Sequence, residues 1–135
     1  MNNNEELNKI KKFYDDEYYS NVTLTSNHHK IPWHYRLIAS RLKEFSNKSV
    51  LDVACGQGEW LSCLKNINCQ VTGIDLSDKA IEFCKSIITD GNFVCGPAES
   101  LPFADASFDL VTCLGALEHF TDKPAALKEM LRVAI

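Results

Sequence analysis

Short apolar runs alternate with amphipathic stretches from residue 49 to the end of the chain. Apolar runs of strand length occupy residues 50–53, 70–74 and 92–95, and a fourth is expected at residues 108–114. The first two stretches between these runs carry apolar residues at helical spacing, so they predict helices. The last helix is expected to present one apolar face, made of Leu127, Met130, Leu131 and Ala134. Repeated strand–helix units with unbroken apolar strands predict an α/β fold, a doubly wound parallel sheet with helices on both faces.

The order of the strands follows from the handedness of their connections. Because crossovers between parallel strands are right-handed, the four strands are expected in the order 3-2-1-4. The fourth strand is then an apolar edge, and such an edge tends to pair with another chain. The sequence therefore predicts self-association through the edge of the fourth strand.

Residues 1–48 have a different pattern and predict a helical region. A first helix is marked by apolar and aromatic residues at helical spacing, which are Leu7, Ile10, Tyr14 and Tyr18. A polar loop over residues 20–30 follows, and Pro32 then opens a second helix. The buried stripe of that helix is expected to consist of Ile38, Leu42 and Phe45. The chain is thus expected to divide into a helical region, residues 1–48, and a strand–helix domain, residues 49–135.

Composition and charge exclude several classes of protein. The 135 residues carry 14 Lys and Arg against 18 Asp and Glu, a net charge of -4, without the basic excess that nucleic-acid binding requires. No apolar run approaches the about 18 residues of a membrane span, and the amino terminus has no signal core, so we expect a soluble cytoplasmic protein. The six cysteines form no C-x-x-C pair and are expected to be free buried thiols rather than zinc ligands or disulfides.

The candidate chemistry is concentrated in residues 50–60, VLDVACGQGEW, where a strand leads through Gly56 and Gly58 directly into a helix. Two glycines allow a ligand to approach the backbone closely. The dinucleotide fingerprint G-x-G-x-x-G fails in either register, because its third glycine would fall on Glu59 or Leu61. The carboxylates of Asp52 and Glu59 would repel a pyrophosphate and attract a cationic centre. The turn therefore favours a ligand with an ammonium or sulfonium group.

Further candidate residues follow the other strands. Asp75 ends the second strand, where a carboxylate can accept hydrogen bonds from both ribose hydroxyls. The third strand leads into residues 96–111, and the fourth leads into residues 114–120. These loops all lie beyond the carboxyl ends of parallel strands, where open α/β sheets bind ligands. They are expected to converge on one crevice.

Four motifs carry a resemblance to a known family. VLDVACGQGEW, VTGIDLS, AESLPFADASFDLV and LGALEHFTDKPAALKEMLRV resemble, in this order, the successive motifs of class I S-adenosylmethionine-dependent methyltransferases. The resemblance covers residues 49–133 and is greatest to the type 11 small-molecule group, which includes quinone-biosynthesis enzymes. It implies a Rossmann-like S-adenosylmethionine-binding domain that methylates a small-molecule acceptor. FYDDEYY and the helix from Pro32 resemble the variable lid of the family.

The resemblance assigns the methionine end of the cofactor to the first and fourth loops. It implies that Asp52 lies near the methionyl ammonium and that Ala54, Gly56 and Gly58 form the turn beneath the methionine moiety. Leu114 would line the region of the sulfonium. Ala54 replaces the first glycine of the motif, which is a common variant.

The adenosine end is assigned to the second and third loops. Asp75 would bind the ribose, Leu76 would pack on the adenine, and Ala98 would offer backbone groups to the edge of that base. Pro97 stands where many relatives have an Asp that accepts a bond from the adenine amino group. This departure is expected to reshape adenine recognition without abolishing it, because the packing on Leu76 remains.

Glu118 and His119 follow the fourth strand and are the candidate catalytic residues. His119 would either take a proton from the acceptor or shape the acceptor site. A Glu-His pair joins a metal site in some quinone-pathway relatives, but the further acidic partner is not evident, and no metal is expected. His28, His29 and His34 are interpreted as polar residues because they lack partners at ligand spacing.

The remaining aromatic and acidic candidates are given structural interpretations. Asp109 begins the fourth strand, far from its carboxyl end, and is expected to be structural. Trp33, Tyr35 and Trp60 are expected to pack in the core, and Tyr14 or Tyr18 to close over the cofactor.

Members of this family continue beyond the position of Val133 into further strands. The chain is therefore expected to be an amino-terminal portion that binds cofactor weakly and has little activity by itself. Two alternatives stay open. One is a non-catalytic domain that binds S-adenosylmethionine or a partner, and the other is a nucleotide-dependent oxidoreductase, which the missing third glycine disfavours.

Overall fold

The computed structural model describes residues 3–21 and 31–135. The polar loop expected at residues 20–30 falls almost wholly outside these ranges, as do His28 and His29.

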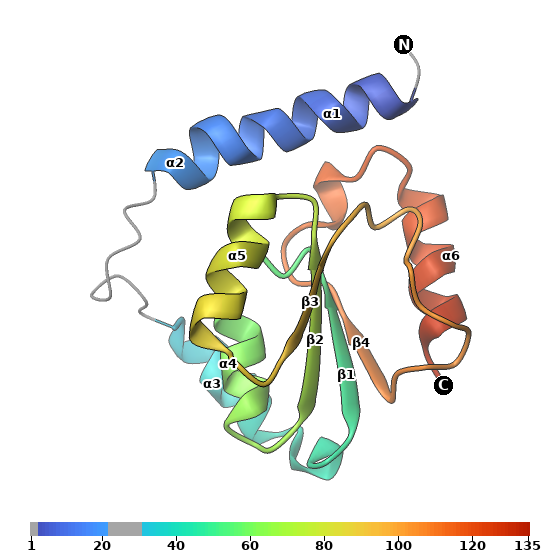
Figure 1. Cartoon of the computed structure of the whole chain (residues 1–135). Coiled ribbons are helices and arrows are strands. Elements are labelled where there is room, and N and C mark those ends of the chain that lie inside the picture. Colours follow the sequence, from blue (N-terminus) through green and yellow to red (C-terminus); the bar gives the residue numbers. More distant parts are fainter. Residues whose placement is uncertain (1–2, 22–30) are drawn as a thin grey trace.

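A four-stranded sheet forms the centre of the molecule (Figure 1). Its strands are β1 (Ser49–Val53), β2 (Gln70–Asp75), β3 (Asn92–Cys95) and β4 (Leu110–Thr112). All of their pairings are parallel, and the order is β3-β2-β1-β4. The predicted fold class and strand order are therefore confirmed.

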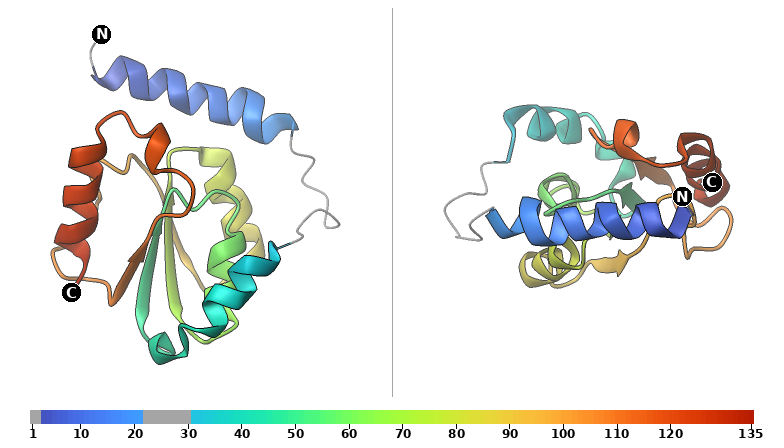
Figure 2. Two further views of the ribbon diagram at one scale, coloured as in Figure 1. Left: turned by 180° about the vertical axis from the view of Figure 1, so that it is seen from behind. Right: turned by 90° about the horizontal axis from the view of Figure 1, so that it is seen from above.

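Helices cover both faces of the sheet (Figure 2). One face packs against α3 (Trp33–Ser40), α4 (Glu59–Lys65) and α5 (Asp78–Ile87), and the other packs against α6 (Lys123–Val133). Successive residues of a strand point to opposite faces, so Val50 joins the first core and Leu51 joins the second. This is why β1 is apolar along nearly its whole length instead of alternating apolar and polar residues.

The fourth strand is shorter than the predicted span of residues 108–114. Only Leu110–Thr112 pair with β1 as a strand, and Phe108 forms an isolated parallel bridge with Ala134. Between them, Asp109 holds the start of β1 by accepting hydrogen bonds from the backbone N–H of Ser49 at 2.9 Å and from its hydroxyl at 2.8 Å. Within the described ranges β4 pairs with β1 alone, and the expected self-association stays a prediction.

The predicted apolar face of the last helix is wrong by about one residue. Ala126 and Val133 are buried in the second core, with Met130 packed against it, whereas Leu127 is 45% exposed and Leu131 is 76% exposed. Ala126, Met130 and Val133 have the i, i+4, i+7 spacing of one helix face. Ala126 and Val133 face the second core between α6 and the sheet, whereas Leu127 and Leu131 face away from it.

The helical region departs from the prediction at its second helix. That helix ends at Ser40 and is followed by a 3₁₀ turn, η2 (Lys43–Phe45), which breaks the helical spacing. Leu42 and Phe45 pack against the core as expected, but Ile38 is 43% exposed and Trp33 is 74% exposed. The predicted burial of Ile38 and Trp33 is therefore wrong.

The first helical segment lies across the end of the sheet at which the strands end (Figures 1 and 2). It consists of α1 (Asn3–Phe13), the π-helical turn η1 (Tyr14–Tyr18) and α2 (Tyr19–Asn21), and we call these residues, 3–21, the amino-terminal helix. A π-helical turn inside a longer helix is rare and is often found at a functional site.

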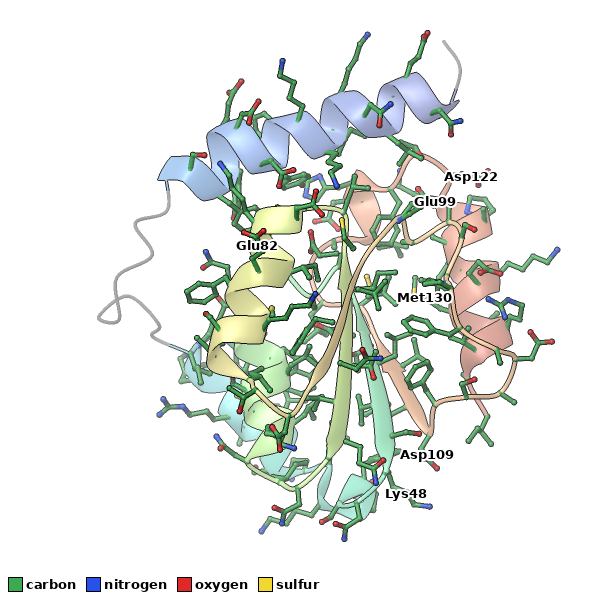
Figure 3. All side chains as sticks on the ribbon, viewed as in Figure 1. Lys48, Glu82, Glu99, Asp109, Asp122 and Met130 are labelled. Carbon is green, nitrogen blue, oxygen red and sulfur yellow. The ribbon has the colours of Figure 1, made fainter. Side chains whose placement is uncertain are left out.

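The opposite end of the sheet has a structural role. Lys48 and Asp109 lie there, far from Glu99 and Asp122 at the other end (Figure 3), and form an ion pair at 3.6 Å. The structural interpretation of Asp109 is thus confirmed. Within the described residues, none of the helices is both long and apolar enough to cross a membrane.

Candidate ligand-binding cleft

A cleft of about 740 Å³ is lined by residues at the carboxyl ends of the strands and by residues of the amino-terminal helix. Its volume is in the range of small-molecule sites. The predicted site residues in its wall are Asp52, Ala54, Gly56, Asp75, Leu76, Ala98, Leu114 and His119. Residues from four separate loops thus converge on one cavity, as the positions of the strand ends predicted.

Gly58 and Glu118 do not contribute to the wall of this cleft. Gly58 is the N-cap of α4 with a φ of 81°, and a Cβ at this position would lie 3.0 Å from the Sγ of Cys84. Gly58 therefore has a structural role in the turn, on the side that packs against α5. Glu118 lies in a 3₁₀ turn, η3 (Leu117–His119), and its carboxylate is 3.7 Å from Nε2 of the half-exposed His119.

The turn after β1 is built from left-handed residues. Ala54, Gly56 and Gly58 have φ values of 60°, 53° and 81°, so every second residue adopts a conformation that favours glycine. At Gly56 a Cβ would lie 3.3 Å from the hydroxyl of Tyr19, which comes from the amino-terminal helix. The turn therefore brings bare backbone to the floor of the cleft.

Asp75 ties this turn to the beginning of α5. Its Oδ2 accepts a hydrogen bond from the backbone N–H of Gly56 at 2.9 Å, and its Oδ1 accepts one from the N–H of Ser77 at 2.9 Å. Each carboxylate oxygen has a second lone pair that can still accept a bond from a ligand. Burial raises the pKa of Asp75, and the bonds from Ser77 and Gly56 act in the opposite direction.

Asp52 is a buried carboxyl group at the floor of the cleft. The hydroxyl of Thr112 donates a hydrogen bond to its Oδ1 at 2.7 Å, and the indole N–H of Trp60 donates to that hydroxyl at 3.1 Å. Burial raises the pKa of Asp52 to about 7, the charges of Asp75 and Glu59 add to this effect, and the bond from Thr112 opposes it. Asp52 therefore changes its charge near neutral pH.

The wall of the cleft is electronegative. Asp52, Asp75, Glu59 and Glu99 all line it, and among the described residues no Lys or Arg does so. Carboxylates gathered in a partly buried site destabilise one another unless a cation or a proton compensates them. The arrangement therefore fits a ligand with a positive charge next to the glycine turn, and it disfavours a pyrophosphate.

Aromatic residues of the amino-terminal helix form the roof of the cleft. Tyr14 and Tyr18, the two expected closing residues, both line it, and Tyr19 does so as well. Tyr35 and Trp60 also line the cleft while contacting each other edge to face, with their ring centroids 5.6 Å apart. Tyr19 belongs to the predicted lid motif FYDDEYY but was not among the residues predicted to close over the cofactor.

A second cavity of about 340 Å³ adjoins the first. It is lined by Lys9, Ile10, Phe13, Tyr14 and His119. Ile10, Phe13, Tyr14 and His119 belong to the walls of both cavities. His119 therefore lies between the main cleft and a smaller, mostly apolar space under α1.

Glu99 is a cleft residue that the sequence analysis also missed. Its Oε1 accepts hydrogen bonds from the backbone N–H of Thr121 at 3.0 Å, from the Thr121 hydroxyl at 2.9 Å and from the N–H of Asp122 at 3.3 Å. Glu99 and Asp122 accordingly lie together beside the beginning of α6 (Figure 3). Glu99 thus connects the loop after β3 to the segment that carries His119. Among the described residues, no group of three His, Cys, Asp or Glu side chains has the arrangement of a metal site.

The fold and the cleft together define a Rossmann-like domain with a cleft at the carboxyl ends of its strands. Residues 51–135 match the sequence profile of the family described as "Methyltransferase domain". The chain belongs to this family.

Individual relatives agree with this assignment. The chain is 36% identical over 103 residues to a demethylmenaquinone methyltransferase of Thermotoga maritima, which covers 75% of this chain and 44% of the relative. It is 36% identical over 130 residues to the enzyme of the same name from Staphylococcus aureus strain JH9, covering 92% of this chain and 52% of the relative. The crystal structure of the YcgJ protein from Bacillus subtilis has a TM-score of 0.70 at 30% identity, over 76% of this chain and 47% of that one. The chain therefore spans about half the length of the curated relatives it matches.

Replacing Ala54 with glycine is expected to stabilise the protein. The left-handed conformation costs an alanine about 1–2 kcal/mol, and the greater flexibility of glycine in the unfolded chain cancels part of the gain. We expect Ala54→Gly to raise the free energy of unfolding by about 0.5–1 kcal/mol in urea denaturation. The control is Ala125→Gly in the first turn of α6, where φ is negative, and it should lower the free energy of unfolding by about 0.5 kcal/mol. A loss of stability in Ala54→Gly would contradict the assigned backbone conformation.

Replacing Asp52 with asparagine is expected to change the pH dependence of stability. A carboxyl group whose pKa is raised on folding stabilises the folded state below its unfolded pKa, and this contribution is lost as pH rises through its folded pKa of about 7. Asp52→Asn keeps an oxygen that can accept from Thr112 but never ionises. The stability of the variant relative to the ligand-free wild type should therefore increase by about 3 kcal/mol as pH rises from 5 to 8. Thermal unfolding of both proteins at pH 5 and pH 8 measures this change. The same difference in stability between variant and wild type at the two pH values would contradict the prediction.

Proposed function

We propose that this protein binds S-adenosylmethionine in the cleft and belongs to an enzyme that transfers its methyl group to a small-molecule acceptor. The observation that carries the proposal is the electronegative wall beside the left-handed turn. A ligand with an ammonium and a sulfonium would compensate Asp52 and Glu59, and membership of a methyltransferase family supports the same ligand. When bound, S-adenosylmethionine supplies an activated methyl group.

The methionine end of this ligand would lie over the turn. Asp52 is the carboxylate that attracts the methionyl ammonium, and binding of the cation favours loss of the Asp52 proton. The backbone from Ala54 to Gly58 lies beneath the methionine moiety, and Leu114 lines the region of the sulfonium. The left-handed conformations at Ala54 and Gly56 support this role, because they bring bare backbone to the cleft floor.

The adenosine end would lie over the second and third loops. Asp75 accepts hydrogen bonds from the ribose with the lone pairs that Gly56 and Ser77 leave free. Leu76 packs on the adenine, and the backbone of Ala98 meets the edge of that base. Both residues line the cleft, and Ala98 is buried.

The acceptor would enter between His119 and the amino-terminal helix. Ile10, Phe13 and Tyr14 form most of the wall of the smaller cavity, beside Lys9 and His119, so it favours a largely apolar molecule. Relatives named demethylmenaquinone methyltransferase support an acceptor of this kind. His119 takes the proton that the acceptor loses, and the carboxylate of Glu118, 3.7 Å from Nε2 of His119, favours the charged imidazolium that results.

One observation favours a second candidate function, a domain that binds S-adenosylmethionine without catalysis. The side chains of His119 and Glu118 are 60% and 65% exposed, whereas proton transfer is usually performed in a site that excludes water. Methyl transfer from labelled S-adenosylmethionine to a short-chain demethylmenaquinol distinguishes the two functions.

Calorimetric titration tests the cofactor assignment. We expect S-adenosylmethionine to bind and NADH not to bind, because the cleft wall carries carboxylates and no Lys or Arg among its described residues. Asp75→Ala should weaken binding by about ten- to a hundredfold, since it removes charge-assisted bonds of about 1.5–3 kcal/mol each. Glu82→Ala removes an equal charge from the surface of α5, outside the cleft (Figure 3), and should leave the affinity unchanged. Equal affinity for NADH would contradict the proposal.

His119→Ala tests the proton-transfer role. Turnover of the demethylmenaquinol analogue should fall by about 100-fold or more while the affinity for S-adenosylmethionine stays nearly constant. The exposed His34 on α3 lies outside the cleft, so His34→Ala is the matched control. A parallel loss of binding and turnover in His119→Ala would mean that the residue only shapes the site.

A further inference from the structure

The amino-terminal helix is fastened to the beginning of α5 by polar contacts. Lys11 forms an ion pair with Asp78 at 2.7 Å, and its Nζ is 3.2 Å from the Sγ of Cys95. One turn further along, the hydroxyl of Ser77 donates a hydrogen bond of 2.5 Å to Oδ1 of Asp15. These contacts join segments about sixty or more residues apart in the chain.

The contact of Asp15 differs from that of Lys11 in its surroundings. Lys11 and Asp78 are 31% and 60% exposed, and exposed ion pairs contribute little to stability. Ser77 is completely buried while the helix is docked, so replacing Asp15 without moving the helix leaves the Ser77 hydroxyl without this acceptor. Asp15 also accepts a hydrogen bond from the backbone N–H of Lys79 at 3.4 Å, and Nζ of Lys79 donates one to the hydroxyl of Ser20 at 2.5 Å. Among these contacts, the Asp15–Ser77 hydrogen bond is the one that involves a completely buried side chain.

Ser77 also leads directly to the cofactor site. Its hydroxyl oxygen accepts a bond from the N–H of Ala80 and caps α5, and its own N–H donates to Oδ1 of Asp75. The other oxygen of Asp75 accepts from the N–H of Gly56. A continuous series of hydrogen bonds thus runs from Asp15 on the amino-terminal helix to the turn on the cleft floor.

The same helix meets the turn a second time through Tyr19. This residue lines the cleft, its hydroxyl lies 3.3 Å from the position of a Cβ on Gly56, and burial raises its pKa. Asp15 and Tyr19 are four residues apart, about one turn of the helix, with the π-helical turn η1 between Phe13 and Tyr19. The helix therefore contacts both ends of the hydrogen-bonded series, Ser77 at one and Gly56 at the other.

We propose that Asp15 is a positioning residue that couples docking of the amino-terminal helix to the geometry of Asp75 and the glycine turn. The inference rests on the proposed function, because it concerns retention of an S-adenosyl ligand under the helix. While Asp15 holds Ser77, the carboxylate of Asp75 and the N–H of Gly56 are kept in register and the roof of the cleft is closed. Docking of the helix then increases the affinity for the ligand by some factor. By thermodynamic linkage, a bound ligand must increase the equilibrium constant for helix docking by that same factor.

Three variants separate positioning from simple attachment. Asp15→Ala removes the acceptor, Asp15→Asn keeps an oxygen that can accept from Ser77, and Asp16→Ala alters the exposed neighbouring acid on the same turn. Stopped-flow displacement measures the release rate of S-adenosylhomocysteine. Hydrogen exchange of the ligand-free protein measures protection of the amides of Gly56, Ser77 and residues 3–21.

We expect Asp15→Ala to release the ligand about tenfold faster and to lose protection at Gly56 and Ser77 as well as along the helix. Asp15→Asn should restore both measurements to within about threefold of the wild type, and Asp16→Ala should match the wild type.

Other results would overturn the inference in distinguishable ways. Faster exchange in residues 3–21 of Asp15→Ala, with unchanged ligand release and unchanged Gly56 and Ser77 amides, would mean that Asp15 only attaches the helix. No change in any measurement would exclude the coupling. If the wild type binds no S-adenosyl ligand, the proposed function fails, and protection of the Gly56 and Ser77 amides alone then decides whether Asp15 positions the turn.

Discussion

The single carboxylate of Asp75 accepts hydrogen bonds from two backbone N–H groups that belong to different loops. One belongs to Gly56 in the turn after β1, and the other belongs to Ser77 at the beginning of α5. A carboxylate that accepts from two rigid backbone groups has a fixed orientation, so the cleft floor and the start of α5 keep one relative position. The remaining wall of the cleft is arranged around this fixed element, including the helix that Ser77 fastens through Asp15.

The electrostatics of the cleft oppose its stability. Asp52 is buried close enough to Asp75 and Glu59 for their charges to raise its pKa, and Thr112 relieves only part of this cost. A compact protein retains such a cost where a ligand compensates it, which is why active and binding sites are often less stable than they could be. The proposed cationic ligand provides that compensation, and a proton on Asp52 provides it in the ligand-free protein.

Much of the fold could be predicted because its signals are local. The runs that became β1, β2 and β3 are apolar and bounded by turn residues. In the structure, Ser77 caps α5 with its hydroxyl, which accepts a hydrogen bond from the backbone N–H of Ala80. β4 was predicted too long because an apolar run does not indicate where its neighbouring strand ends. The buried face of α6 was misassigned because helical spacing alone does not show which face of a helix meets the sheet. Leu131 has the spacing of a core residue, but it is exposed.

The sequence by itself determined the chemistry of the cleft floor. Gly56 follows the first strand and Asp75 ends the second. In any parallel sheet with right-handed crossovers, the glycine turn and the carboxylate of Asp75 therefore lie at the same edge. Only the tertiary structure decided which distant residues close the site. Tyr19 and Glu99 reach the cleft through the docking of the amino-terminal helix and the fold of the loop after β3. Such contacts depend on packing angles between segments far apart in the chain, and no local pattern of residues encodes those angles.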